Sequence, residues 1–217
     1  MGRGQGKRKG YYFGRDWGRL SHMTKDAEIR VATWDDAPKI GALMGLAFAA
    51  DPFVRWILPD PLNYVEHNVQ HPGRTAAPAF DEGTAFILGD NLGAAVWLSP
   101  GAKLNRSVET GSAGEKSGFA RPKEFPELIK QSGAYKPSTP HWYLAFIAVD
   151  PAHRGKGIGT RLMKHTLKTV DQDGLPTYLE STNQANLTLY ERFGFELLAK
   201  VTVGQSPARF PMLRPAQ

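Results

Sequence analysis

The chain has 217 residues, of which 41% are hydrophobic and 22% are charged, the composition of a globular protein that can bury one sizeable core. It contains no cysteine, which excludes disulfides, thiolate metal sites and a cysteine nucleophile, and we expect a cytoplasmic protein. Residues 1–22 carry six basic side chains against one acidic, so they account for +5 of the net charge of +6. The rest is nearly neutral, and no nucleic-acid-binding face is expected on the folded domain.

The N-terminal segment and the body of the chain are predicted to differ in order. Glycine and charge dominate residues 1–22, so they are predicted to be a disordered basic extension or an added or upstream-start segment. The alternative is a basic tail that touches anionic polymers and is needed for function. Residues 23–217 are predicted to form one domain. Its longest uncharged apolar run, residues 40–50, is too short to span a bilayer, so no membrane association is expected.

The first half of this domain combines both periodicities of regular structure. Alternating apolar residues predict strands, and apolar residues spaced by three and four predict helices. In chain order we expect a strand at 28–33, a helix with Asp35 and Asp36 at its N-terminus that ends or bends at Asp51-Pro52, a partly helical stretch at 62–81, and a hairpin of strands at 85–88 and 94–98. A loop should follow over residues 100–121, which are poor in large apolar side chains.

The second half alternates strands and helices. We expect a short helix at 124–131, a buried central strand at 141–149, a helix at 158–170, a strand at 177–180, a helix at 184–193, and strands at 195–203 and 208–213. Hairpins and strand-helix-strand units occur together. The predicted fold class is therefore α/β with a mixed sheet.

A glycine-rich turn between the central strand and the next helix carries the strongest functional indication. It consists of Arg154, Gly155, Lys156, Gly157, Ile158, Gly159 and Thr160. Glycines let the backbone approach a bulky anion, and the first amides of a helix have no internal partner. Two basic side chains add positive charge. The turn is therefore predicted to bind a diphosphate.

Two other phosphate-binding motifs fit this turn less well. A P-loop needs Gly-Lys-Ser/Thr after four residues, which is absent. A dinucleotide fingerprint needs its third glycine one residue later, although Glu180 ends the next strand about where a ribose-binding acid would sit. Too few strand-helix units follow to complete a dinucleotide-binding domain.

Two blocks of the sequence resemble the GNAT N-acetyltransferase superfamily. Arg154-x-x-Gly157-x-Gly159 after a strand matches its acetyl-CoA motif, and residues 186–195 match its asparagine-to-tyrosine helix with the Gly-Phe turn that follows. The resemblance covers residues 28–214 and implies a mixed, mostly antiparallel central sheet flanked by helices. It implies transfer of an acetyl group from acetyl-CoA to a primary amine.

Within the superfamily, two stretches are similar to the puromycin N-acetyltransferases. They are residues 178–192 and the helix end at 47–52. This similarity favours an aminonucleoside, a drug or a metabolite as the amine. The alternatives are a protein or peptide N-acetyltransferase and a CoA-binding regulatory module without turnover. The resemblance also implies a monomer or a homodimer.

The resemblance assigns cofactor-binding roles to particular positions. It implies that the backbone of Ile147, Ala148 and Val149 pairs with the pantetheine arm, that residues 154–160 take the diphosphate, and that Asn186 contacts the arm. Tyr190 is the candidate general acid. It lies four residues after Asn186, on the same helix face. A tyrosine of pKa about 10 is protonated at neutral pH and can donate to a thiolate. A packed core tyrosine is the alternative role.

Candidate residues for the acceptor are fewer. An alkylamine of pKa about 10.4 is almost fully protonated at pH 7, so a general base would help, and Glu180 is the first choice. Its alternative role is an ion pair with a nearby Arg or Lys, and a weakly basic amine needs no base. Trp56 and Trp142 could line a pocket for a flat or apolar amine. Asp51 could bind a cationic substrate or simply end a helix.

No metal site is expected. His67 and His71 are four residues apart, but they lack the glutamate of a His-Glu-x-x-His motif.

Overall fold

The computed structural model describes residues 27–66, 75–105 and 122–217. The predicted extension at residues 1–22 lies outside these ranges. The strands are β1 (Ile29–Val31), β2 (Ala85–Leu88), β3 (Gly93–Leu98), β4 (Trp142–Val149), β5 (Thr177–Ser181), β6 (Glu196–Leu197) and β7 (Phe210–Arg214). The α-helices are α2 (Ala37–Ala47), α3 (Pro52–Ile57), α5 (Ala77–Asp81), α7 (Phe125–Gly133), α8 (Ile158–Val170) and α9 (Leu187–Glu191), and residues 61–66 are also helical. Short 3-10 turns are η1 (Trp34–Asp36), η3 (Pro151–His153), η4 (Asp171–Asp173) and η5 (Gln184–Asn186).

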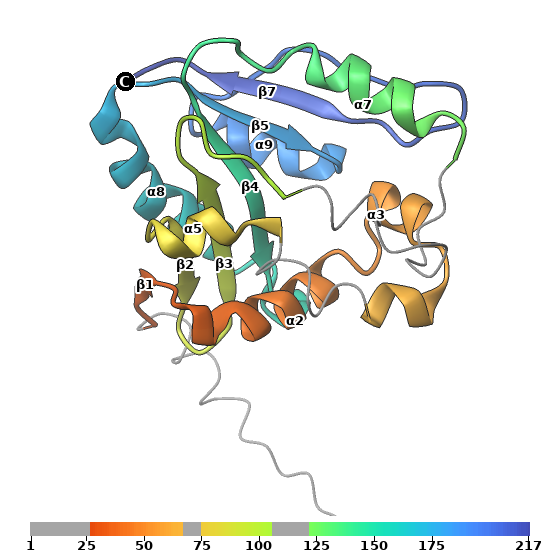
Figure 1. Cartoon of the computed structure of the whole chain (residues 1–217). Coiled ribbons are helices and arrows are strands. Elements are labelled where there is room, and N and C mark those ends of the chain that lie inside the picture. Colours follow the sequence, from red (N-terminus) through yellow and green to blue (C-terminus); the bar gives the residue numbers. More distant parts are fainter. Residues whose placement is uncertain (1–26, 67–74, 106–121) are drawn as a thin grey trace, which may run out of the picture.

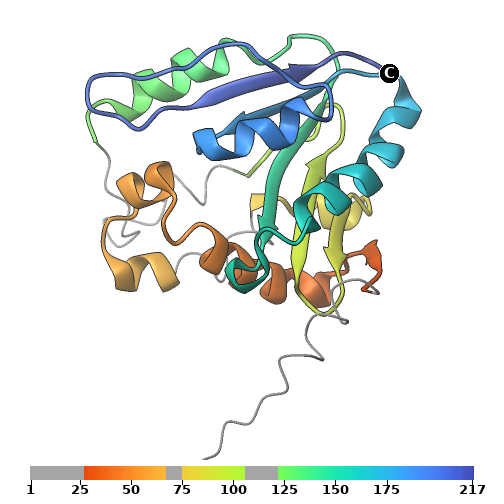
Figure 2. The same cartoon turned by 180° about the vertical axis from the view of Figure 1, so that it is seen from behind.

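The strands form one seven-stranded sheet in the order β1-β2-β3-β4-β5-β7-β6 (Figure 1). Among these strands, the neighbours β4 and β5 run parallel and the other adjacent pairs are antiparallel. Helices lie on both sides of the sheet, with α8 on the far side from α2 and α5 (Figures 1 and 2). The expected mixed, mostly antiparallel sheet flanked by helices is confirmed.

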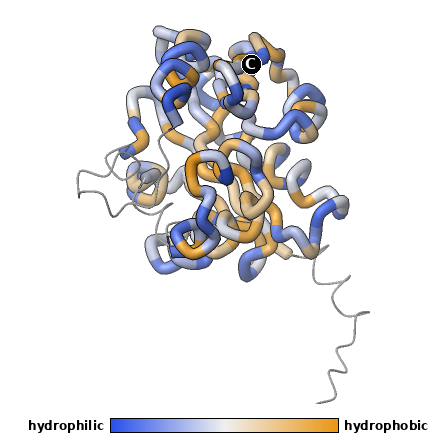
Figure 3. The backbone as a smooth tube through the Cα atoms, turned by 90° about the vertical axis from the view of Figure 1, so that its right-hand side faces the viewer, coloured by the Kyte–Doolittle hydropathy of each residue, from blue (hydrophilic) through white to orange (hydrophobic). Residues whose placement is uncertain are grey.

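Both faces of β2 and β3 are buried, which explains their nearly continuous apolar sequences. Alternate residues of β2 and β3 enter two separate core clusters. Trp97 packs in the cluster that lies against α8 and α9, whereas Val96 packs in the one beneath α2 and α5. Hydrophobic segments accordingly lie mainly toward the middle of the molecule, and hydrophilic segments lie mainly at its periphery (Figure 3).

The sequence misplaced three elements. The predicted strand at 195–203 pairs with β7 over Glu196–Leu197, with one further bridge at Val201. Both β6 residues are exposed, so no packing enforces a longer edge strand. The predicted helix at 184–193 begins as a 3-10 turn. The helix expected to end or bend at Asp51-Pro52 stops at Ala47, and α3 begins as a separate helix at Pro52.

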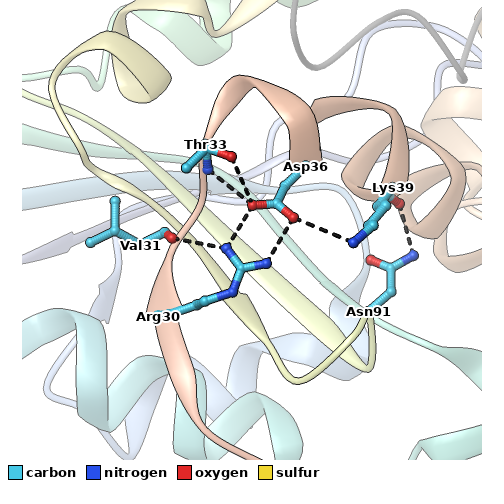
Figure 4. Close-up of polar contacts among 6 residues, drawn as sticks. All are labelled: Arg30, Val31, Thr33, Asp36, Lys39 and Asn91. Atoms are coloured by element: carbon cyan, nitrogen blue, oxygen red, sulfur yellow. Dashed lines mark hydrogen bonds and ion pairs between the residues drawn. The ribbon is translucent and has the colours of Figure 1, made fainter.

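An ion pair between Arg30 and Asp36 fixes the passage from β1 into α2 (Figure 4). The contact is bidentate, with Nη1–Oδ2 and Nη2–Oδ1 distances of 2.6 and 2.8 Å, and Oδ2 also accepts the backbone N–H of Thr33. The Lys39 ammonium lies 3.6 Å from Oδ1. The hydrogen bond from Arg30 is the main reason why the pKa of the buried Asp36 lies well below its usual range.

A capping residue explains α3. Asp51 Oδ1 accepts the backbone N–H groups of Phe53 and Val54, each at 3.0 Å, and Pro52 occupies the first helical position. Oδ2 accepts the hydroxyl of Thr182, just beyond β5, at 2.7 Å. One buried carboxylate therefore starts α3 and ties it to the sheet.

Replacing Asp36 with Asn should lower the free energy of unfolding by about 1–3 kcal/mol at pH 7, because the amide cannot accept all of these donors. The folded-state pKa of Asp36 lies below the unfolded value of about 3.9, so its contribution is complete above about pH 5 and is lost as the pH falls. In urea unfolding, the difference between wild type and D36N should therefore become smaller as the pH is lowered from 5 to 3. Asp35→Asn, at the exposed neighbouring carboxylate, is the control. A difference that is unchanged at low pH would contradict the assignment.

Replacing Asp51 with Ala should cost about 1–2 kcal/mol, because α3 loses its N-cap. Thr182→Val removes the contact to the sheet but keeps the cap, so it should cost less. Denaturant unfolding of the two variants measures both effects. Equal losses would mean that the tertiary hydrogen bond, and not the cap, stabilises α3.

Candidate active site

The strands β4 and β5 separate soon after they begin. They pair at Trp142–Thr177 and Tyr143–Tyr178, and beyond these residues the two strands diverge (Figures 1 and 2). β4 stays paired with β3 on its other edge up to Val149. The carboxyl half of β4 therefore has no strand partner on its β5 side within the described residues, and backbone groups there are available to another molecule.

A β-bulge in β4 lies where the strands part. Val96 pairs with Phe146 and Trp97 with Leu144, so Ala145 has no partner residue on β3. Ala145 and Phe146 consequently both pack against the cluster beneath α2. Such a bulge bends the strand and increases its twist. The expected central position of β4 is correct, but Ala145, Phe146 and Ile147 are half-buried, not fully buried.

The glycine-rich turn lies at the carboxyl end of β4 and opens α8. Gly155 and Gly157 have φ angles of +75° and +76°, which side-chain-bearing residues rarely adopt. A Cβ atom at either position would meet no atom within 4 Å. Gly157 is the N-cap of α8, and no side chain caps this helix. The turn from Arg154 to Thr160 therefore fits the predicted diphosphate site, which we call the cradle. Its backbone is accessible, and it leads into the N-terminus of a 13-residue helix.

Three basic residues surround this turn. Arg154 donates from Nη2 to the carbonyl oxygen of Ala47 at 2.7 Å, which ties the turn to the carboxyl end of α2. Lys156 is exposed. Arg192, which follows α9, donates from Nη2 to the hydroxyl of Thr160 at 3.5 Å. The sequence did not point to Arg192, because it reaches the turn from another helix.

The two helical candidates, Asn186 and Tyr190, differ in environment. Asn186 is exposed at the start of α9. Tyr190 is buried in the core cluster, with its ring edge toward Phe195 at a centroid distance of 6.1 Å. Burial raises the pKa of Tyr190 above its ordinary value, so its hydroxyl is protonated at neutral pH. Both roles considered for this tyrosine, packed residue and proton donor, need that protonated form.

The helix that carries these residues packs closely on the turn. A Cβ atom at Gly159 would lie 3.3 Å from Leu189 Cδ2 and 3.9 Å from Val149 Cγ2. An added Cβ at position 159 would require the Leu189 side chain to shift by a few tenths of an ångström. The third glycine of the turn therefore serves helix packing, whereas the first two serve backbone conformation.

Glu180 forms an ion pair with Arg209. The Oε2–Nη2 distance is 2.8 Å, and the two side chains are 7% and 10% exposed. Glu180 Oε1 and Arg209 Nε are both buried without a hydrogen-bond partner among the described residues. The ion-pair role considered for Glu180 is therefore present, and one carboxylate oxygen is left over. The sequence did not indicate Arg209, which precedes β7 in a loop without a pattern.

Of the acceptor candidates, Trp56 belongs to a group of three rings. Centroid distances are 6.1 Å from Phe53 to Trp56, 6.4 Å from Phe53 to Phe125, and 6.3 Å from Trp56 to Phe125. All three side chains are half-buried, and Phe125 reaches the group from α7. We call Phe53, Trp56 and Phe125 the aromatic trio.

The other two acceptor candidates have structural roles. Trp142 is buried in the cluster that lies against α8, and its Nε1 donates to Asp173 Oδ2 at 2.9 Å. The neighbouring Tyr143 packs against the cluster on the opposite face. This corrects the expectation that Trp142 lines an acceptor pocket. Asp51 has both carboxylate oxygens engaged, as described above, and it begins α3 instead of ending the preceding helix, which stops at Ala47.

The described residues contain no group of three or more potential metal-binding side chains. His67 and His71 lie outside the described residues. In the described part of the chain, no helix is both long and apolar enough to cross a membrane.

Comparisons with known proteins indicate the family that the chain resembles. The model of the Acetyltransferase (GNAT) family matches residues 101–195. Mycothiol acetyltransferase of Acidimicrobium ferrooxidans is 32% identical over 175 residues, which cover 72% of this chain and 54% of that protein. An uncharacterized N-acetyltransferase of Schizosaccharomyces pombe is 27% identical over 142 residues, which cover 60% of this chain and 58% of that protein. The chain thus spans little more than half the length of these two relatives.

Solved structures extend the agreement to the whole fold. A Corynebacterium glutamicum structure described as histone acetyltransferase HPA2 and related acetyltransferase has a TM-score of 0.62 and 27% identity. The match covers 88% of this chain and 97% of that one. Arylalkylamine N-acetyltransferase 2 of Aedes aegypti has a TM-score of 0.61 at 12% identity, covers 88% and 100%, and supports the fold alone. Motifs, sheet topology and relatives agree: residues 101–195 match the GNAT family, and the chain has the fold of GNAT acetyltransferases.

Proposed function

We propose that the chain is an acetyl-CoA-dependent N-acetyltransferase that acts on a primary amine of a small molecule. The observation that carries this proposal is the separation of β4 from β5. The free edge of β4 leads to the N-terminus of α8, which is lined by glycines and has no side-chain cap. A free strand edge suits the amides of a pantetheine arm, and the helix N-terminus beside it suits a diphosphate.

The proposed cofactor contacts follow this path along the chain. They are the backbone of Ile147, Ala148 and Val149, the turn from Arg154 to Thr160, and Asn186 at the start of α9. When bound, acetyl-CoA supplies an already activated acetyl thioester, so the absence of cysteine costs nothing. We include Arg192 among these contacts, because its guanidinium already reaches Thr160.

Two side chains carry the proposed proton transfers. Glu180 Oε1 accepts a proton from the amine, directly or through a water, because Oε2 is committed to Arg209. An alkylamine of pKa about 10.4 has only about one neutral molecule in 2500 at pH 7, so this step matters for a strongly basic acceptor. Tyr190 holds a proton at Oη for the leaving sulfur, since burial keeps the phenol neutral.

The small-molecule acceptor is the finer part of the proposal. It is supported by the relative named mycothiol acetyltransferase, whose match covers more of this chain than the 24% matched by N-alpha-acetyltransferase 30 of Xenopus laevis. The similarity to puromycin N-acetyltransferases rests on residues 47–52 and 178–192 alone, and the relatives named here include none of them. The proposal therefore names a small-molecule amine and no particular aminonucleoside.

Calorimetric titration with acetyl-CoA tests cofactor binding. Gly157→Ala should weaken binding at least tenfold, because it strains the left-handed N-cap and puts a methyl group in the proposed cradle. Gly174→Ala is the matched control. Its φ is +60° and its Cβ also meets nothing within 4 Å, but it follows η4 at the other end of α8. Both variants should lose similar stability, and equal acetyl-CoA affinity in the two would exclude the cradle. NADH, which should not bind, controls for the dinucleotide alternative.

Turnover tests the role of Tyr190. Tyr190→Phe should lower kcat by about 10²–10⁴, with acetyl-CoA affinity near that of the wild type, because only the proton donor is removed. The release of the CoA thiol over time measures the rate, and mass spectrometry of the amine identifies the acetylated product. Tyr64→Phe, which removes a hydroxyl bonded to the Gly45 carbonyl oxygen, is the control and should keep full turnover. An unchanged kcat in Y190F would make Tyr190 a packing residue only.

A further inference from the structure

We propose that the Glu180–Arg209 pair and the aromatic trio form one acceptor subsite, which selects monoamines that carry an aromatic group over aliphatic diamines. This inference rests on the proposed function and specifies its substrate class. The amine nitrogen lies at Glu180 Oε1, and its aromatic substituent lies against the trio.

A chain of hydrogen bonds brings the two halves of this subsite together. Glu180 lies near the end of β5, and Thr182 follows directly after that strand. The Thr182 hydroxyl donates to Asp51, which caps α3 and thereby fixes Phe53 two residues later. The guanidinium of Arg209 lies over the ring of Phe53, 4.9 Å from its centroid, and donates to Glu180. The same arginine therefore contacts both Phe53 of the trio and the carboxylate.

The Glu180–Arg209 ion pair leaves one carboxylate oxygen without a hydrogen-bond donor, which indicates the chemistry of a ligand. The Glu180 side chain is only 7% exposed, yet its Oε1 has no hydrogen-bond partner among the described residues. A buried acceptor without a donor is unfavourable, and an amine N–H can supply that donor. Arg209 leaves the carboxylate pair neutral overall and holds Oε2, so it is a positioning residue that leaves Oε1 for the ligand.

The surroundings disfavour a second positive charge. Next to the carboxylate lie the Arg209 cation and the Tyr178 side chain, and the guanidinium lies over Phe53, the ring that Trp56 and Phe125 contact. A second ammonium would lose water and meet a like charge, whereas a flat aromatic group can stack on exposed ring surface. The same argument disfavours a short alkylamine, which leaves the rings uncovered.

Competing amines test the proposal in the full chain with saturating acetyl-CoA. We expect kcat/KM for 2-phenylethylamine to exceed that for 1,4-diaminobutane and for propylamine at least tenfold. Trp56→Leu should lower the value for 2-phenylethylamine about five- to tenfold and change the value for propylamine less than twofold. Trp34→Leu replaces an exposed tryptophan that stacks on Phe80 outside the subsite, so it should leave every ratio unchanged.

Arg209 variants separate positioning from folding. Arg209→Met should raise the relative value for 1,4-diaminobutane and lower kcat more than it raises KM, since Glu180 loses its fixed orientation. Arg209→Lys should restore part of kcat. A thermal shift with acetyl-CoA shows that each variant is folded and binds the cofactor.

The outcomes distinguish this inference from the function on which it rests. No acetyl-CoA shift in the wild type would overturn the proposed function. An acetyl-CoA shift with preference for the diamine or a peptide, with equal rates for all amines, or with no acetylation of 2-phenylethylamine would overturn the acceptor subsite alone. A uniform loss in W56L for every amine would also overturn it.

Discussion

The early separation of β4 from β5 is the constraint on which the rest of the site depends. Two residue pairs hold the strands together, and the unpaired Ala145 then bends β4 while β5 continues alongside β7. A sheet normally satisfies the backbone groups of its central strands. Here one edge of a central strand lacks that partner for most of its length. The free edge leads directly into the turn at Gly155 and Gly157, so a ligand that pairs with the strand also reaches the N-terminus of α8.

The opposite side of the sheet is tied to this site by polar contacts that span the sequence. Arg154 bonds the last carbonyl of α2, and Asp51 joins the start of α3 to Thr182 beyond β5. Ion pairs and caps of this kind are worth little on an exposed surface and more where one partner is buried, as Asp51 is. The two helices are thus positioned by the strands whose separation defines the site. A change in either anchor would move acceptor-side residues relative to the turn.

The sequence predicted the local features of the fold and site and missed those that depend on distant segments. The glycine turn, α8 and the Tyr190 helix were readable because turn chemistry and helical spacing are local. Helix α3 was missed, because its six residues are too few for a periodic pattern and depend on the Asp51 cap. Arg209 and Phe125 join Glu180 and Trp56 only through folding, so no spacing could indicate them. Trp142 was misassigned for the same reason: composition does not tell which face of β4 a tryptophan occupies.

The ion pair and the general base, first considered as alternatives for Glu180, are compatible once the geometry is considered. Arg209 occupies one carboxylate oxygen, and the other remains buried and unpaired. A lone buried carboxylate would be costly, and a fully paired one could not receive a proton. A carboxylate with one engaged oxygen avoids both problems, since the cation offsets its charge while Oε1 stays available. The acceptor amine then completes a hydrogen-bonded network that the protein alone leaves one donor short.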